Sequence, residues 1–190
     1  MRLIVGLGNP GPSYRDTWHN AGFRTIDRLM SVHAPGRTGS TWTGSIGGHA
    51  VGLFKPQAYM NRSGPPVVRR LRQLDLGPRD LLVIHDDIDL PRGILRFKTK
   101  GRSGGHRGVE SIMDALDTDG FLRLKLGVGR PPPGIDPAEF ILTPLVGQEL
   151  AYRDAMAQEA AETVVTWLAN GLDAARQRVP CLSADDRGPG

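Results

Sequence analysis

His19 and Asp86 are the two residues of this sequence best suited to move a proton together. His19 stands at the end of a long loop, next to the start of an amphipathic helical pattern, and Asp86 follows a short apolar run at 81–84. A neutral imidazole can take a proton from water near pH 7, and a carboxylate on its other ring nitrogen fixes the tautomer and stabilises the imidazolium. We therefore predict that His19 is a general base oriented by Asp86. The alternative is a histidine that only caps or hydrogen-bonds the helix start.

Two asparagines stand on loops that should reach the same place. Asn9 follows the first predicted strand, and Asn61 follows a predicted hairpin at 41–54. Ligand sites of open α/β sheets gather at the carboxyl ends of strands, and an amide suits a peptide backbone or a developing oxyanion. Alternatively, both amides satisfy only the backbone of their turns. Loop side chains that could form an apolar wall or a stacking platform are Tyr14, Tyr59 and Met60.

Positive charge is concentrated in two segments. The net charge is +4, but residues 92–107 contain six basic residues and no acidic one, and residues 55–72 contain five. This distribution favours a polyanionic partner, with a merely solvated basic face as the alternative. The cations that we expect to hold nucleic-acid phosphate are Arg96, Lys98 and Lys125.

The run from Gly6 to Gly11 matches the dinucleotide pattern G-x-G-x-x-G. That fingerprint requires a helix that begins inside the glycine turn and an acidic residue after a second strand. Here the Asn-Pro-Gly-Pro run at 9–12 blocks an immediate helix, and Asp27 lies within the helical pattern itself. A dinucleotide-dependent oxidoreductase is therefore disfavoured.

Metal and protein-nucleophile chemistry also lack a supporting pattern. The acidic residues that follow 81–84 are contiguous without a second acidic cluster, and the histidines form no H-E-x-x-H pair. No serine sits in a G-x-S-x-G elbow. The single cysteine, Cys181, excludes an internal disulfide framework and a cysteine-based metal site. We predict no metal site.

Length and composition are those of an ordinary globular protein. The chain has 190 residues, 39% of them hydrophobic and 23% charged. No apolar run approaches the ~20 residues of a membrane span, and the N-terminus is a predicted strand rather than a signal peptide. We expect one domain over residues 1–179, a disordered tail over 180–190, no membrane association and a cytoplasmic location.

Hydrophobic periodicity predicts interleaved strands and helices. Strands are predicted at 3–7, 41–54 (a hairpin turning at 47–48), 81–84, 94–99 and 122–128, and helices at 21–32, 64–74 (capped by Ser63), after His106 and at 150–168. The strand at 122–128 is predicted to be half-exposed, with Arg123 and Lys125 outward, and 129–137 to be a proline-rich loop. The order predicts a three-layer α/β/α domain around a twisted mixed β-sheet.

Four segments, in this order, resemble the bacterial peptidyl-tRNA hydrolase family: VGLGNPGPSYRDTWHNAGF (5–23), KPQAYMNRSG (55–64), HDDIDLPRG (85–93) and SGGHRGV (103–109). The likeness runs from Met1 to about Gly171. It implies hydrolysis of the ester that joins a peptide to the 3′ ribose of tRNA, which releases free tRNA and an N-blocked peptide. It also implies no metal or organic cofactor, no obligate protein partner and a monomer.

The resemblance assigns roles to individual residues. The match to His19 activates water, the match to Asp86 orients it, and the match to Asn9 distinguishes N-blocked peptidyl-tRNA from aminoacyl-tRNA, so we count all three as catalytic. The substrate-binding residues are expected to be Tyr14, Tyr59, Met60, Asn61 and Arg107. The matches to Arg96, Lys98 and Lys125 meet tRNA phosphate.

The chain departs from the family pattern at two positions. The family usually has T-R-H-N where this chain has Trp18 before His19, and G-G-H-N-G where this chain has Arg107. Trp18 could alter packing or stacking without touching the chemistry. Arg107 replaces an amide with a permanent cation, which favours phosphate or carboxyl contacts. A non-catalytic RNA-binding relative is a further alternative, but one that has no reason to keep His19, Asp86, Asn9 and Asn61.

Overall fold

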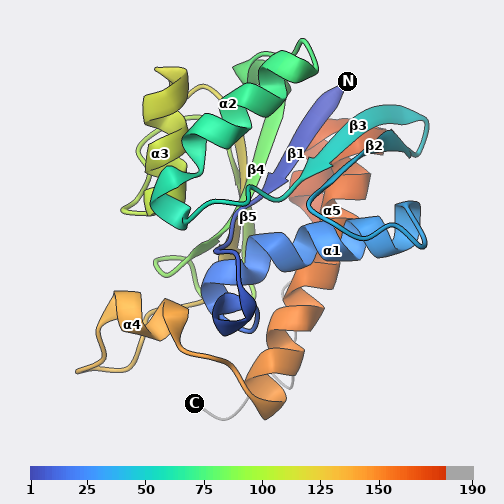
Figure 1. Ribbon diagram of the computed structural model, residues 1–190. Coiled ribbons are helices and arrows are strands. Elements are labelled where there is room, and N and C mark those ends of the chain that lie inside the picture. The colour runs from blue at the N-terminus through green and yellow to red at the C-terminus, as the bar shows by residue number, and fades with distance from the viewer. Residues whose placement is uncertain (179–190) are drawn as a thin grey trace.

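A six-stranded sheet forms the centre of the computed structural model, which describes residues 1–178 (Figure 1). The strands lie in the order β2-β3-β1-β4-β6-β5. Their bounds are β1 Arg2–Gly6, β2 Thr41–Ile46, β3 His49–Phe54, β4 Leu81–Asp87, β5 Leu95–Lys98 and β6 Leu122–Gly127. The α-helices are α1 Ala21–His33, α2 Gly64–Gln73, α3 Arg107–Leu116, α4 Pro137–Leu142 and α5 Gly147–Arg178. Short 3₁₀ turns are η1 Pro12–Tyr14, η2 Trp18–Asn20, η3 Met60–Arg62 and η4 Pro78–Asp80.

The sheet is mixed, as the sequence predicts. β3, β1, β4 and β6 are parallel to one another, while β2 and β5 pair antiparallel at the two edges. β1 and β4 are central and covered on both faces, which explains their nearly continuous apolar sequences. The carboxyl ends of the parallel strands therefore meet at one edge of the sheet.

Helices cover both faces of the sheet (Figure 1). Ile4 of β1 belongs to the core that α1 and α5 complete, whereas its neighbours Leu3 and Val5 belong to the core beneath α2 and α3. The split follows from the alternation of side chains along a strand. On the α1 side the approach is very close, because a Cβ on Gly6 would lie 2.1 Å from the carbonyl oxygen of Gly22. This close contact places the first turn of α1 directly against the end of β1.

One helix was not predicted. Residues 137–142 form α4 directly after the expected proline-rich loop. Oδ1 of Asp136 accepts hydrogen bonds from the backbone N–H groups of Ala138 (2.8 Å) and Glu139 (3.1 Å). An acidic N-cap followed by a proline in the first turn is a recognised helix start, and the density of prolines before it obscured the signal.

The prediction for β6 was wrong in one respect. Arg123 is only 2% exposed, although Lys125 is partly exposed. β4 and β5 pair with both edges of β6, and the Arg123 side chain contacts the backbone of Arg102 and Asp119, which lie outside the strand. The two terminal nitrogens of the Arg123 guanidinium donate to the carbonyl oxygens of Arg102 (3.1 Å) and Asp119 (3.2 Å).

Two helix ends also differ from the prediction. The hydroxyl of Ser63 does not cap α2 but donates to the carbonyl of Met60 at 2.8 Å. The last helix extends over Gly147–Arg178, with non-helical backbone at Gly171. The expected tail at 180–190 lies outside the described residues. Within residues 1–178, no helix is long and apolar enough to cross a membrane.

Candidate active site

The carboxyl edge of the parallel strands opens into a cavity of about 480 Å³. Its lining comes from the loops after β1, β3 and β4, from the start of α3 and from α4. The predicted residues that line it are Asn9, His19, Tyr59, Met60, Asn61, Asp86 and Arg107. Sheet topology thus brings together residues that lie far apart in sequence, as the strand-end argument predicts.

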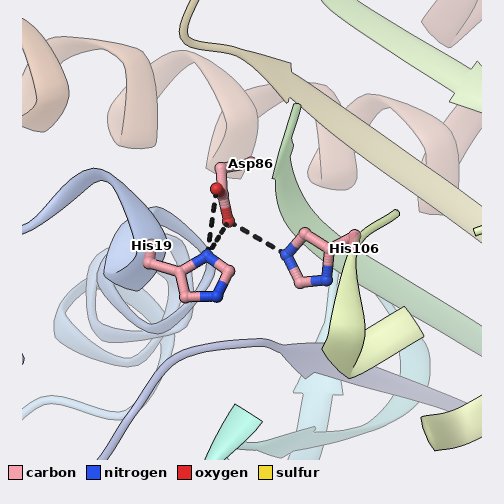
Figure 2. A group of neighbouring side chains, drawn as sticks. All are labelled: His19, Asp86 and His106. Carbon is pink, nitrogen blue, oxygen red and sulfur yellow. Dashed lines mark hydrogen bonds and ion pairs between the residues drawn. The ribbon is translucent and has the colours of Figure 1, made fainter. Parts of the chain in front are cut away.

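His19 and Asp86 form a buried pair in this cavity. Nδ1 of His19 lies 3.0 Å from both carboxylate oxygens of Asp86, and the two side chains are 8% and 2% exposed. A carboxylate only accepts, so the proton of the neutral imidazole lies on Nδ1. The lone pair is then on Nε2, on the side of the ring away from Asp86 (Figure 2). This is the tautomer that a general base requires.

His106 joins His19 and Asp86 in a hydrogen-bonded group of three residues, which we call the relay. Its Nε2 lies 3.1 Å from Oδ1 of Asp86 (Figure 2). Its Nδ1 accepts from the backbone N–H groups of Gly108 (3.2 Å) and Val109 (3.3 Å), so the side chain caps α3. Because a backbone N–H can only donate, Nδ1 carries no proton and Nε2–H donates to Asp86. Asp86 is therefore held from both sides.

Burial and charge act in opposite directions on this relay. Burial would lower the pKa of His19, but the charge and hydrogen bond of Asp86 outweigh it and raise the pKa above 6.5, with the charge of Arg107 opposing them. Burial would raise the pKa of Asp86, but His19 and His106 hold it well below its ordinary value. Asp86 is thus ionised throughout the physiological range.

His85 lies next to the relay in a different state. Its Nδ1 donates to the backbone carbonyl of Asp86 at 2.7 Å, and its ring meets His106 edge-on, with centroids 4.6 Å apart. Burial, followed by repulsion from His106, lowers its pKa well below 6.5. His85 is a neutral packing partner of His106 near pH 7.

The relay contains the atoms of a possible metal site, since one ligand atom each from His19, Asp86 and His106 lies within 4.8 Å of the others. The hydrogen bonds argue against that use. A neutral His106 whose Nδ1 accepts from the start of α3 carries its proton on Nε2, and so has no lone pair there for a metal. The donor set fits a hydrogen-bonded relay, not a metal centre.

Asn9 is locked in one orientation. The side chain of Asn20 makes two hydrogen bonds to the Asn9 backbone, accepting from its N–H at 2.8 Å and donating to its carbonyl at 2.9 Å. Oδ1 of Asn9 accepts from the backbone N–H of Met60 at 2.7 Å. The acceptor end of the Asn9 amide is thus engaged within the fold. Its Nδ2 group remains as the donor that Asn9 offers to the cavity.

The other expected substrate residues line this cavity, with the exception of Tyr14. Met60 is buried, whereas Tyr59 is 58% exposed and Arg107 is exposed. Tyr14 does not line this cavity, but its ring meets the Tyr59 ring edge-on at a centroid distance of 6.4 Å. Trp18 is buried against Tyr152, with Arg92 over its ring, and so acts in packing.

The expected phosphate residues lie together on neighbouring strands. Arg96 of β5 is paired in register with Lys125 of β6, and Lys98 lies two residues farther along β5. Burial, then repulsion from Lys125 and Arg123, lowers the pKa of Lys98. Lys125 forms an ion pair with Asp87, which the sequence did not suggest. Arg96 and Lys98 are therefore the freer cations.

Sequence reasoning missed three contributors to the site. His106 was named as part of a motif and as the residue before a helix, but not as a site residue, and its place at the N-cap of α3 was the signal that it could be held there. Asn20 was named only as part of a motif. The apolar wall from α4, which includes Ile141 and Leu142, had no signal because the helix itself was not predicted.

Comparison with known proteins identifies relatives along nearly the whole chain. The family model described as peptidyl-tRNA hydrolase matches residues 3–186. A peptidyl-tRNA hydrolase of Aquifex aeolicus is 44% identical over 154 residues, which cover 78% of this chain and 80% of the relative. One of Nocardia farcinica is 40% identical over 185 residues, covering 93% and 95%.

Solved structures of peptidyl-tRNA hydrolases also resemble this chain over nearly its whole length. The crystal structure of peptidyl-tRNA hydrolase from Acinetobacter baumannii superposes with a TM-score of 0.84 at 33% sequence identity. The match covers 94% of this chain and 93% of that one. A complex of a peptidyl-tRNA hydrolase with N-propanol also has a TM-score of 0.84, at 32% identity.

Proposed function

The chain belongs to the peptidyl-tRNA hydrolase family and hydrolyses peptidyl-tRNA, and we propose that His19 is the general base of this reaction and that Asp86 orients it. The observation that carries the proposal is the buried contact of His19 Nδ1 with both oxygens of Asp86, at 3.0 Å each. This contact leaves Nε2 as the basic nitrogen.

The proposed steps conserve every proton. His19 Nε2 takes a proton from a water molecule while the water oxygen attacks the ester carbonyl carbon. Asp86 stabilises the imidazolium that forms. As the tetrahedral intermediate collapses, the proton passes from Nε2 to the departing 3′ oxygen of the ribose. The products are tRNA with a free 3′ hydroxyl and a peptide with a free carboxyl group.

Asn9 is proposed to select N-blocked substrates. Its remaining donor, Nδ2, can bond the carbonyl that an N-blocked residue carries next to its nitrogen. An ordinary aminoacyl-tRNA has an ammonium group there, which also donates, so the two groups cannot pair. The support is the lock on Asn9 by Asn20 and Met60.

The remaining assignments follow the position of each residue. We propose that the peptide and the terminal nucleoside contact Tyr14, Tyr59, Met60, Asn61 and Arg107, and that tRNA phosphates contact Arg96, Lys98 and Lys125. Action as a monomer without an obligate protein partner is part of the same proposal. A substrate produced by translation supports a cytoplasmic location.

Replacement of His19 by alanine tests the proposal. With N-acetyl-aminoacyl-tRNA as substrate, kcat should fall by about 10²–10⁴-fold, while the protein still binds tRNA. His49→Ala is the matched control, because His49 is exposed on the β2–β3 hairpin. If His19→Ala retained more than about a tenth of the wild-type rate, the general base would have to be another group.

A further inference from the structure

Two open hollows continue the catalytic cavity along the surface of α3 and α2. The first measures about 530 Å³ and shares Asn61 and Arg107 with the catalytic cavity. The second measures about 620 Å³ and shares Pro65 and Ala115 with the first. Shared lining residues connect the two hollows to each other and to the catalytic cavity. We call the two hollows together the α2–α3 furrow. It leads away from His19 across the outer surface of the two helices.

Small residues form the floor of this furrow. The backbone N–H of Gly64, at the start of α2, donates to the hydroxyl of Ser111 on α3 at 3.0 Å. A Cβ on Gly64 would lie 2.0 Å from the carbonyl oxygen of Ser111 and 2.7 Å from the Cβ of Ala115. The helices thus touch backbone to backbone, and no large side chain fills the space above the contact.

The walls of the furrow carry unpaired charges of both signs. Glu110 and Asp114 of α3 line the first hollow, and Arg69 and Arg72 of α2 line the second. Within residues 1–178, none of these four side chains forms an ion pair with another residue. Charges that are left unpaired beside an active site are available to a ligand.

We propose that the α2–α3 furrow binds the peptide part of the substrate beyond the residue esterified to tRNA. This inference rests on the proposed function, because it takes the catalytic cavity as the place of ester cleavage. A long peptide must leave that cavity, and the furrow opens from it between Asn61 and Arg107. The carboxylates of Glu110 and Asp114 would repel RNA phosphate at this point, which favours a polypeptide as the occupant.

The dimensions suit several residues of extended chain. An α-helix rises about 1.5 Å per residue, so the path from Arg107 to Ala115 is about 12 Å long. An extended peptide covers that length with about four residues. The peptide would then pass Glu110 and Asp114 within about four residues of the point where it leaves the catalytic cavity, and reach Arg69 and Arg72 beyond them.

Substrate length provides the first test. We would compare kcat/KM for N-acetyl-aminoacyl-tRNA with that for the same tRNA bearing an uncharged octapeptide. Ala115 is exposed, so Ala115→Trp fills the furrow without entering the core. It should lower kcat/KM for the long substrate several-fold more than for the short one. Ala155→Trp, at an exposed position of α5 outside the furrow, is the matched control and should leave the ratio unchanged. An unchanged ratio in Ala115→Trp would overturn the proposal.

Peptide charge provides a second test, which keeps the proposal falsifiable if the tryptophan variant does not fold. With one charged residue moved along the peptide a position at a time, wild type should prefer lysine to glutamate by about two- to fivefold at low salt where that residue lies beside Glu110 and Asp114. Glu110→Gln combined with Asp114→Asn should remove this preference. If tRNA occupies the furrow instead, Arg69→Ala with Arg72→Ala should weaken short and long substrates equally, which overturns the peptide assignment. If wild type cleaves neither substrate, the proposed function is contradicted, whereas cleavage of both substrates with an unchanged ratio in Ala115→Trp contradicts only the furrow.

Discussion

Nε2 of His106 donates to Oδ1 of Asp86 at 3.1 Å, while Nδ1 of the same ring accepts from the first turn of α3. One imidazole therefore connects a helix cap to the carboxylate that is hydrogen-bonded to His19. The backbone of α3 determines the tautomer of His106, His106 and His19 determine the position of Asp86, and Asp86 determines the tautomer of His19. This order of dependence leads to separable predictions for each member.

His106→Asn should separate the cap from the relay. Asparagine is a strong N-cap residue, so the thermal stability of the variant should stay close to wild type. The shorter side chain removes the hydrogen bond to Asp86, so kcat should fall with little change in KM. His106→Ala loses both functions and should also lower the free energy of unfolding by about 0.5–2 kcal/mol. If kcat of His106→Asn equals that of wild type, His106 serves only as a cap.

Asp86→Asn should move the pH dependence of kcat. His19 must be neutral to act as a base, so the rate of wild type falls as the pH drops through the His19 pKa, which lies above 6.5. Asp86 raises that pKa, and burial lowers it. In Asp86→Asn the acidic limb should therefore shift to lower pH, while kcat on the plateau falls. A profile of kcat against pH measures both effects. If the acidic limb of Asp86→Asn coincided with that of wild type, Asp86 would not control the protonation of His19.

His85 should make folding sensitive to mild acid. Its folded pKa lies well below 6.5, because it is buried and faces His106. Below pH 6.5 the unfolded chain binds a proton at His85 that the folded protein does not bind, so stability is present above that pH and is lost as the pH falls. His85→Asn should reduce this loss, measured by urea unfolding at pH 7.5 and 5.5. His49→Asn, at an exposed position, is the control. If both variants lost the same stability between pH 7.5 and 5.5, His85 would not be the source of the acid sensitivity.

The cations of β5 and β6 should govern the salt dependence of tRNA binding. Each phosphate contact that is lost should reduce the slope of log K against log salt by about one unit. Arg96→Ala and Lys98→Ala should have the larger effects, since Lys125 is paired with Asp87. A minimal substrate that lacks the tRNA body should be cleaved equally by wild type and by the variant that combines Arg96→Ala, Lys98→Ala and Lys125→Ala. Equal losses on both substrates would contradict the phosphate assignment.

The sequence alone predicted the layers of the fold and the pairing of His19 with Asp86. β1 and β4 are short apolar runs between turns, and such runs are stable only when both faces are covered, as both are here. The amphipathic pattern at 21–32 predicted α1 to within one residue of its end. Because the carboxyl ends of parallel strands share one edge, the meeting of Asn9, His19, Asp86 and Asn61 also followed from the order of elements.

Only the tertiary structure decided how the polar atoms of the site are paired. The bond from His106 to Asp86 spans 20 residues and that from His19 to Asp86 spans 67, and nothing in local sequence indicates which nitrogen of each ring faces the carboxylate. The burial of Arg123 depended on contacts with Arg102 and Asp119 outside β6, which the alternation of side chains along the strand did not reveal. Periodicity reports which face of an element is covered, whereas hydrogen-bond partners depend on atomic distances across elements. Those distances exist only once the chain has folded.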